Sequence, residues 1–363
     1  MPITVREVLN ALNQIAPPQW ALRDDPIGLQ IGSPDQSVER ILVALDPDPR
    51  TAVQAHYRGC QLLITHHPLI YRPLRTIRFD DPVGQAVQTL CAHQIAHIAV
   101  HTNWDTAPGG INDALAQTVG LEEVRPFGEG ACVSQFKLVV FVPTAYLDPV
   151  LDAMADAGAG VIGLYRRCAF YHPGTGTYEP MEGANPFQGA VGQREHAEEM
   201  RLEVLVPADR LETVIAEMKR VHPYEEVAYD VYPLHTPQVY PLGRVGRLPR
   251  AMLASELRDY LAEKLGNPYV RVYGKPNAII RTLAVVGGSG GDYLAQAKAA
   301  LADALLTGEV RHHHTLEAWA RDIVLFEGGH AETEMPGVYA LAERLRPLLE
   351  PYGVEILTQG GHS

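Results

Sequence analysis

Short apolar runs, each followed by a helical pattern, recur through the first 130 residues and again from residue 241. Leu62–Thr65 and Ala304–Thr307 are examples, and both runs stop abruptly at polar or glycine residues. Short runs of this kind, separated by helical segments, are typical of buried parallel strands in α/β proteins. The pattern therefore predicts a layered α/β core, with side chains of functional interest gathered where the parallel strands end.

A different pattern separates the two halves of this core. Between residues 131 and 240 the chain reads strand, helix, an irregular stretch at 171–192, then strand, helix and strand. Two strand–helix–strand units predict a ferredoxin-like α+β domain. The predicted organisation is an α/β core formed by residues 1–130 and 241–363 and interrupted by an inserted domain at 131–240. The irregular stretch, rich in glycine, proline and tyrosine, is either a lid over a cavity or a plain surface loop.

Charge and composition exclude several classes of protein. The 363 residues include 30 Lys and Arg against 43 Asp and Glu, a formal net charge of −13, which disfavours nucleic acid as a partner. No apolar run approaches the roughly 18 residues that cross a bilayer, so we expect no membrane partner. The four cysteines contain no CxxC pair, which favours a reducing, cytoplasmic location.

Histidines and carboxylates follow three of the predicted strands. These residues are His66 and His67, His101 and Asp105, and His330 and Glu334. His330 and Glu334 are four residues apart, so they would share one face of a helix that begins there. Imidazole and carboxylate groups bind transition metals, and a carboxylate can bridge two cations about 3.5–4 Å apart. Together the three groups predict a dinuclear metal site.

Each group also has a purely structural explanation. The two adjacent histidines could form an exposed loop pair, Asp105 could cap a helix starting near residue 110, and Glu334 could be an acid near the positive end of a helix. The glycine run at 287–291 could offer backbone amides to a phosphate. It matches neither GxGxxG nor the Walker loop, so we favour a tight packing turn.

Five segments, in their order along the chain, resemble a known family. They are LLITHHPL at 62–69, HTNWDTAPGGINDALA at 101–116, VVGGSGG at 285–291, LTGEVRHH at 306–313 and GGHAETEMPG at 328–337. The family is the dinuclear-metal-centre family, whose members are often labelled GTP cyclohydrolase type 2 homologues or Nif-three-like proteins. The segment HPYEEVAYDVY at 222–232 resembles the end of the ferredoxin-like domain inserted in the longer members.

The resemblance implies two divalent metal ions per chain (zinc, manganese, iron or cobalt) held by five ligands, with Asp105 bridging: His66, His67, Asp105, His330 and Glu334. It implies that His101 and either Glu309 or His313 support the ligands or transfer protons at the same site. The chain reads Gly-Glu-Val-Arg before two histidines where many relatives have an Asp and an aromatic. The role of Glu309 and the choice between His312 and His313 therefore stay open. The resemblance also implies a homohexameric ring with the metals facing an internal cavity.

Two functions fit these features. The first is a dinuclear metal-dependent hydrolase acting on a nucleotide or another phosphate-bearing small molecule, and a cyclohydrolase acting on a purine ring is its narrower form, suggested by the family label. The alternative is a non-enzymatic metal-binding ring that senses a ligand or docks a partner protein through its inserted domain. Binding of DNA through the ring is disfavoured by the net charge of −13.

Overall fold

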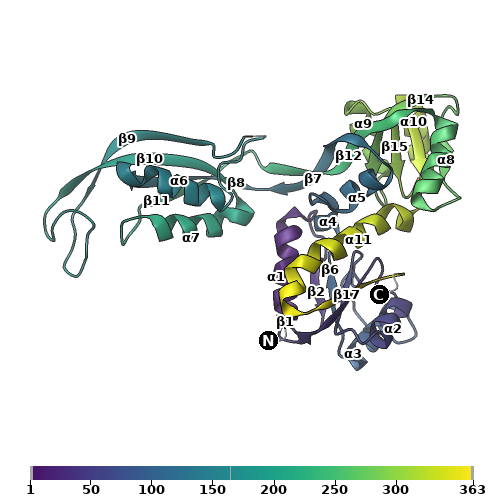
Figure 1. Ribbon diagram of the computed structural model, residues 1–363, viewed down its shortest axis with the longest axis horizontal. Coiled ribbons are helices and arrows are strands. Elements are labelled where there is room, and N and C mark those ends of the chain that lie inside the picture. The colour runs from purple at the N-terminus through teal and green to yellow at the C-terminus, as the bar shows by residue number, and fades with distance from the viewer. Residues whose placement is uncertain (1–2, 164, 361–363) are drawn as a thin grey trace. The chain divides into compact units, whose positions relative to one another are not determined.

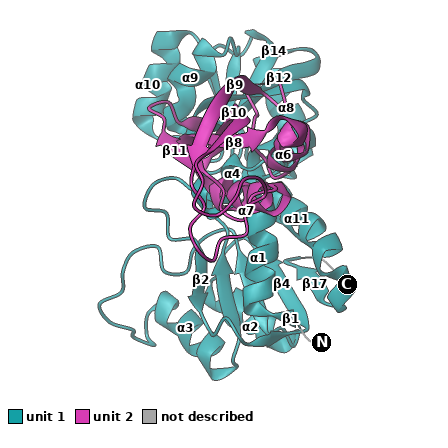
Figure 2. Cartoon of the chain, turned by 90° about the vertical axis from the view of Figure 1, so that its left-hand side faces the viewer, with its two compact units in different colours: residues 1–131, 239–363 teal, residues 132–238 magenta. Residues whose placement is uncertain are grey.

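The computed structural model describes residues 3–163 and 165–360, which form two compact units (Figures 1 and 2). Unit 1 consists of Met1–Ala131 and Val239–Ser363, and unit 2 of Cys132–Gln238. Strands and helices are mixed throughout, which confirms the α/β fold class. Within the described ranges, no helix has the length and hydropathy needed to cross a membrane.

The first sheet of unit 1 has five strands in the order β17-β4-β5-β6-β2. Their bounds are Gly28–Ile31 (β2), Arg40–Ala44 (β4), Leu62–Thr65 (β5), Ala96–Ala99 (β6) and Glu355–Thr358 (β17). The strands β17, β4, β5 and β6 are parallel, as the sequence predicts, and β2 pairs antiparallel with β6. All four residues of β5 and of β6 are buried, which explains their continuous apolar runs.

Three helices and a short strand pair complete this part of unit 1. The helices are α1 (Val5–Ile15), α2 (Pro49–Tyr57) and α3 (Pro82–Ala92), and β1 (Ile3–Thr4) pairs with β3 (Ser37–Val38). Thr4 is the N-cap of α1 and forms a capping box with Glu7. The capping box satisfies two backbone donors that a helix leaves free at its start.

The second sheet of unit 1 has six strands in the order β13-β16-β15-β14-β12-β7. Their bounds are Glu122–Val133 (β7), Gln238–Leu253 (β12), Arg271–Tyr273 (β13), Ile279–Val286 (β14), Ala304–Thr307 (β15) and Val324–Glu327 (β16). The strands β14, β15 and β16 are parallel, whereas β12 and β13 pair antiparallel with their neighbours. Three further helices belong to this half: α8 (Ala254–Leu265), α9 (Leu294–Ala299) and α10 (His312–Arg321). The presence of two sheets rather than one was not evident from the sequence pattern.

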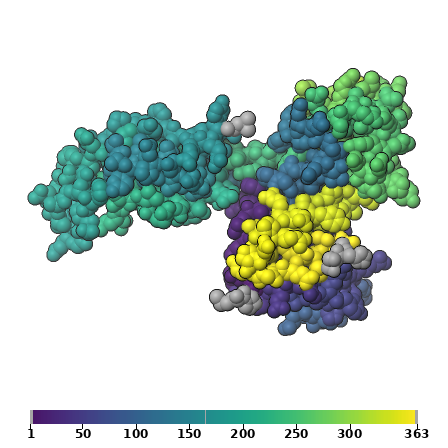
Figure 3. Space-filling view, viewed as in Figure 1, coloured from purple at the N-terminus to yellow at the C-terminus, as the bar shows by residue number. Residues whose placement is uncertain are grey.

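The long helix α11 (His330–Leu349) connects the two halves of unit 1. It packs against α1 and against α5 (Ile111–Thr118), and its apolar side chains join the core of the first sheet. Figure 3 shows the C-terminal residues, in yellow, between the purple residues of the first sheet and the green ones of the second. The helix begins at His330, so His330 and Glu334 share one face as the sequence analysis expects, and it accommodates Pro336 in its interior. Proline there removes one backbone hydrogen bond, which tertiary packing offsets.

Unit 2 is a four-stranded antiparallel sheet with two helices. Along the chain its elements are β8 (Gln135–Pro143), α6 (Leu147–Asp156), β9 (Ala169–Tyr178), β10 (Glu195–Pro207), α7 (Leu211–Val221) and β11 (Tyr229–Pro233). The sheet order β11-β8-β10-β9 and the β-α-β-β-α-β sequence are those of a ferredoxin-like motif. The predicted irregular stretch at 171–192 is wrong in its first part, where β9 pairs with β10. Proline and glycine are tolerated there because β9 is an edge strand.

Candidate metal centre

The ends of the parallel strands position the first group of candidate residues. His66 and His67 directly follow β5, and their backbone amides donate hydrogen bonds to the carbonyls of Ala44 and Leu45, over 3.1 and 2.9 Å. His101 follows β6 and precedes the short helix α4 (Thr102–Thr106), which carries Asp105. These residues therefore lie at the carboxyl edge of the first sheet, where α/β proteins build their sites.

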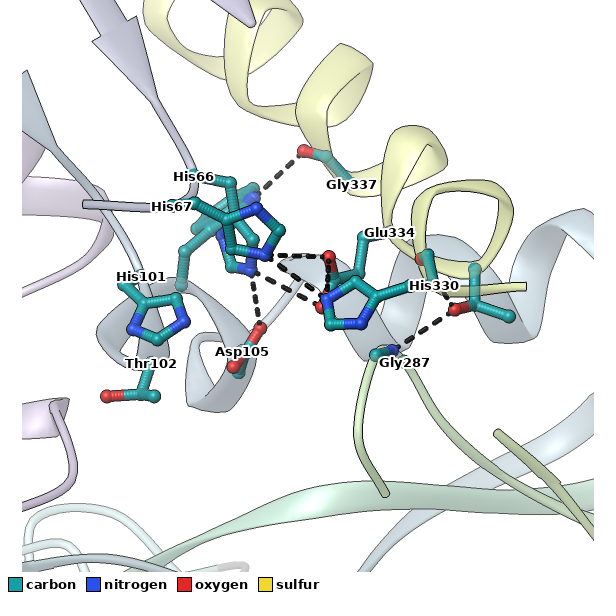
Figure 4. Close-up of polar contacts among 12 residues, drawn as sticks. His66, His67, His101, Thr102, Asp105, Gly287, His330, Glu334 and Gly337 are labelled. Atoms are coloured by element: carbon teal, nitrogen blue, oxygen red, sulfur yellow. Dashed lines mark hydrogen bonds and ion pairs between the residues drawn. The ribbon is translucent and has the colours of Figure 1, made fainter. Parts of the chain in front are cut away.

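The second group comes from the start of α11. His330 is its first residue, and Glu334 lies one turn later on the same face. Figure 4 shows these two side chains pointing toward His66, His67 and Asp105. The structure thus brings together all five residues that the family resemblance implies as ligands.

Short distances separate the potential ligand atoms. The Nε2 atom of His66 lies 3.5 Å from Asp105 Oδ1 and 3.8 Å from Glu334 Oε1. Glu334 Oε2 lies 3.1 Å from the Nε2 atom of His67 and 3.2 Å from that of His330, and the two Nε2 atoms are 3.3 Å apart. Ligands about 2 Å from a tetrahedral cation are themselves about 3.3 Å apart. The spacing therefore suits coordination.

Each histidine of the site is oriented by a hydrogen bond at its Nδ1 atom. The partner of His66 is the carbonyl of Val100, at 3.0 Å. The other three bond to carboxylates at 2.7 Å, in the pairs His67–Asp46, His101–Asp25 and His330–Glu309. An acceptor at Nδ1 fixes the ring and leaves Nε2 facing the site, which is the arrangement that metal-ligating histidines show.

His66 provides a direct test of whether a cation fits. Its side chain is only 1 % exposed, and Nε2 forms no hydrogen bond with any described residue. Since Nδ1 donates to a carbonyl, Nε2 carries a lone pair, and burial holds the pKa of His66 down at about 3. A buried lone pair without a donor is costly in a folded protein. A metal ion between this atom and the two nearby carboxylates would satisfy it, so the residues fit the group.

The remaining charges of the site compensate one another. Burial opposes ionisation of Glu334, but hydrogen bonds from His330 and His67 outweigh it and hold the pKa of Glu334 well below its usual range. In return, bonds to Asp46 and Glu334 outweigh burial and raise the pKa of His67 to about 10, and the bond to Glu334 raises that of His330 to about 9. Burial, reinforced by Glu334, raises the pKa of Asp105 to about 7.

The glycine run after β14 packs against the site. The amides of Gly287, Gly288 and Gly290 donate to the side chains of Asn112, Thr333 and Thr307 at 2.8, 3.1 and 2.8 Å. These amides are used within the fold, which supports the packing turn over the phosphate cradle. Gly288 has a φ of +59°, and a Cβ atom there would overlap Glu334 Oε1. Glycine is therefore required where the loop passes the carboxylate.

The other predicted residues differ in their placement. A ring nitrogen of His101 lies within 4.8 Å of those of His66 and His67, so His101 borders the centre. Glu309 is connected to the centre through His330, whose Nδ1 atom lies 2.7 Å from its carboxylate. Glu309 also accepts a hydrogen bond from the hydroxyl of Ser289, at 2.8 Å. His313 is placed elsewhere.

The side chain of His313 is 60 % exposed and faces Asp292 and His314. Neither it nor His312 has a polar contact with the five clustered residues in the described parts of the chain. The alternative that Asp105 caps the helix after residue 110 is wrong, because Asp105 lies within α4 and the amide of Gly109 bonds to Asp113 instead.

Three residues that support the site were missed from the sequence. Asp25 bonds to His101 and to Thr102, Asn112 donates to the carbonyl of Asp105 at 3.2 Å, and Thr333 holds Gly288. Asn112 lies inside a segment that resembles the family, which was the available signal. Asp25 stands in a loop 76 residues before His101, and no spacing pattern connects the two.

A cavity of about 470 Å³ borders the cluster. His67, His101, Asp105, His330 and Glu334 line it together with Tyr71, Ser289 and Tyr293. A small molecule entering this cavity would therefore meet both the candidate ligands and hydroxyl groups that can donate or accept hydrogen bonds.

Comparison with known proteins now identifies the family. The family model described as Duf34/NIF3 (NGG1p interacting factor 3) matches residues 3–360. This chain belongs to the Duf34/NIF3 family. The match spans nearly the whole chain and confirms the resemblance found in the sequence.

Individual relatives of this Duf34/NIF3 protein are similar over their full length. A protein of Halalkalibacterium halodurans named "GTP cyclohydrolase 1 type 2 homolog" is 36% identical over 359 residues, covering 98% of this chain and 96% of its own. A Bacillus subtilis protein of the same name is 37% identical, with 90% and 87% covered. Among solved structures, the Bacillus cereus protein related to NIF3 has a TM-score of 0.90 at 35% identity, covering 100% and 98% of the two chains.

Proposed function

We propose that this Duf34/NIF3 protein is a dinuclear metal-dependent hydrolase that acts on a nucleotide or another phosphate-bearing small molecule. One observation carries the proposal: the buried Nε2 atom of His66 has no hydrogen-bond partner among the described residues and lies 3.5 and 3.8 Å from two carboxylates. The name of the relatives, GTP cyclohydrolase 1 type 2 homolog, supports a nucleotide and, more narrowly, chemistry on a purine ring.

In this proposal five residues would hold the two cations: His66, His67, Asp105, His330 and Glu334. The donor set of imidazole and carboxylate suits zinc, manganese, iron or cobalt. Two such cations, when bound, lower the pKa of water and stabilise attacking and leaving oxygens during hydrolysis.

The chain's own residues supply orientation and proton transfer. His101 borders the cavity, and Asp25 holds its Nδ1 atom at 2.7 Å. Burial opposes protonation of His101, but the bond to Asp25 outweighs it and raises the pKa of His101. A protonated imidazole facing the cavity can donate its proton to a leaving group. Glu309 orients His330, and we assign no role to His313.

The test combines metal analysis with a hydrolysis assay. Purified protein loaded with each of the four metals is expected to retain two ions per chain, and to hydrolyse at least one member of a panel of nucleotides and phosphoesters. Asp105→Ala should lose the activity and at least one ion while keeping its circular dichroism spectrum, whereas Asp24→Asn, on an exposed loop residue, should behave as the wild type. Absence of turnover with any loaded metal would contradict the hydrolase proposal.

The second candidate is a metal-binding ring that senses a ligand or docks a partner through unit 2. One observation favours it: unit 2 has a cavity of about 490 Å³ lined only by its own residues. Retention of two ions without turnover would favour this function. Both functions include the homohexameric ring that the family resemblance implies and a cytoplasmic location. Analytical ultracentrifugation of the purified protein tests the ring, because a hexamer has six times the mass of the 39.8 kDa chain.

A further inference from the structure

We propose that unit 2 binds an organic cation, an ammonium or guanidinium group on an apolar stem, in the cavity that its own residues form. The cavity, of about 490 Å³, lies where β8, β9 and β10 meet the segments 179–187 and 224–228. This inference does not depend on the proposed hydrolase activity, because every residue that lines the cavity belongs to unit 2.

The walls of the cavity are aromatic. Four rings line it, those of Phe141, Tyr178, Phe187 and Tyr224. The Tyr224 centroid lies 6.2 Å from that of Tyr178 and 5.8 Å from that of Phe187. Ring faces attract cations and also cover apolar stems, so several rings around one space suit an alkylammonium or guanidinium group.

A buried carboxylate supplies the charge. Glu199, on β10, is 8 % exposed and forms no ion pair with any residue in the described part of the chain. The neighbouring strand contributes Gly176, and a Cβ atom at that position would overlap Glu199 Oε2, so the glycine leaves room for the carboxylate. A buried carboxylate without a cationic partner is costly, and Glu199 is therefore suited to bind a cation that enters the cavity.

The rest of the lining provides no competing positive charge. All four charged residues that line the cavity are glutamates, and three of them, Glu179, Glu225 and Glu226, are exposed. The nearby Arg201 is engaged, since its Nε atom lies 2.9 Å from Glu203 and its guanidinium stands over the ring of Phe141. The buried hydroxyl of Tyr224 lies beside Glu199, on the polar side of the cavity. It is a second polar group available to a ligand.

The loop over the cavity is fixed by hydrogen bonds. The hydroxyl of Tyr178 donates to the carbonyl of Gln188 at 3.0 Å, and the amide of Asn185 donates to Glu225 at 2.9 Å. These bonds hold Phe187 at the cavity wall. A metal ion is a poorer occupant than an organic cation, because divalent cations need several oxygen ligands and the wall here is mostly apolar.

The test is calorimetric titration of the full-length protein at low salt with spermidine, argininamide and, as an uncharged probe, 1,6-hexanediol. We expect spermidine or argininamide to bind once per chain and hexanediol not to bind. Glu199→Gln should weaken binding at least about tenfold, and Phe187→Ala, at the half-exposed wall, should also weaken it. Glu198→Gln is the matched control, because Glu198 is the exposed neighbour on the same strand.

Two further measurements complete the test. Glu199→Gln should melt at the same or a higher temperature than the wild type, because it removes an unpaired buried charge, and its metal content should be unchanged. A lysine peptide with blocked termini that binds more tightly than spermidine or argininamide would show that the cation is a side chain of another protein rather than a free small molecule. The proposal is overturned if neither cation binds at about 10 mM, if hexanediol binds equally well, or if the two glutamate variants behave alike.

Discussion

Glu334 contacts three histidines at the candidate metal centre, because its two oxygens lie within 4 Å of the imidazoles of His66, His67 and His330. Glu334→Gln keeps the shape and removes the charge. We expect at least about a tenfold loss of zinc or manganese affinity, measured as metal retained after dialysis. The apo protein should also lose about 3 kcal/mol of stability, since protonated imidazoles lose their buried partner.

The control for this variant is Glu332→Gln. Glu332 lies in the same turn of α11 and has no contact with the three imidazoles among the described residues. It should retain the metal content and stability of the wild type. Equal metal retention by both variants would remove Glu334 from the ligand set.

The second prediction for a single residue concerns Gly288. Gly288→Ala places a Cβ atom against the carboxylate of Glu334, and Gly266→Ala is the matched control because Gly266 has a φ of +63° and no atom within 4 Å of the added Cβ. In both variants the free energy of unfolding, measured with urea, should fall by about 1 kcal/mol because alanine disfavours the left-handed backbone. Only Gly288→Ala should also lose metal affinity, and an equal loss in both would contradict the predicted overlap.

Single residues of the centre were predictable where a metal-binding side chain comes soon after a predicted strand. His66, His67 and His101 follow neighbouring parallel strands of one sheet, so their closeness follows from the layout of an α/β fold. His330 and Glu334 follow a strand of the second sheet, and the packing of α11 brings them to the same place. Asp25 was not predictable, because a loop residue acquires its partner only through tertiary structure. The run of three histidines at 312–314 also could not be resolved, since helix α10 determines which way each ring points.

At the scale of elements, β6 carries a histidine in a fully buried position. His97 is 0 % exposed, its Nε2 atom lies 2.7 Å from Thr65 Oγ1, and burial holds its pKa down at about 3. The unfolded chain takes up this proton near pH 6.5, whereas the native state does not. Stability should therefore fall as the pH drops below about 6.5, by about 1.4 kcal/mol per pH unit for this one group.

Urea unfolding between pH 7 and pH 4 measures this dependence. In His97→Gln, whose amide can still donate to Thr65, the slope should be shallower by the contribution of one proton. His93→Gln, at an exposed position just before the same strand, is the control and should keep the wild-type slope. Identical slopes in the wild type and His97→Gln would show that His97 titrates normally in the native state.

Elements with a regular apolar pattern were predicted to within a few residues, as for β5 and β15. The prediction was wrong where composition opposes the structure. Pro173 and two glycines concealed β9, which is ordered by pairing with β10, and α11 continues through Pro336 in its interior. In both cases tertiary contacts override local preference.

For the whole molecule, the distribution of tryptophan offers a selective probe. All three tryptophans, Trp20, Trp104 and Trp319, belong to unit 1, as do all the candidate metal ligands. Metal at about 100 times its Kd should stabilise the native unit by about 2.7 kcal/mol and raise the fluorescence melting temperature by about 5 °C or more. The same addition should leave Glu334→Gln unshifted, and an equal shift there would mean that the metal acts elsewhere.

The pairing of β17 with β4 has a consequence for how the protein is made. Arg40 meets Glu355 across this pair, 315 positions later, and His67 meets His330 263 positions later. A nascent polypeptide therefore carries an incomplete sheet and three of the five candidate ligands through most of translation. Unit 2, a continuous segment, has all its strands as soon as it leaves the ribosome. The five candidate ligands can thus come together only in chains whose synthesis has passed Glu334.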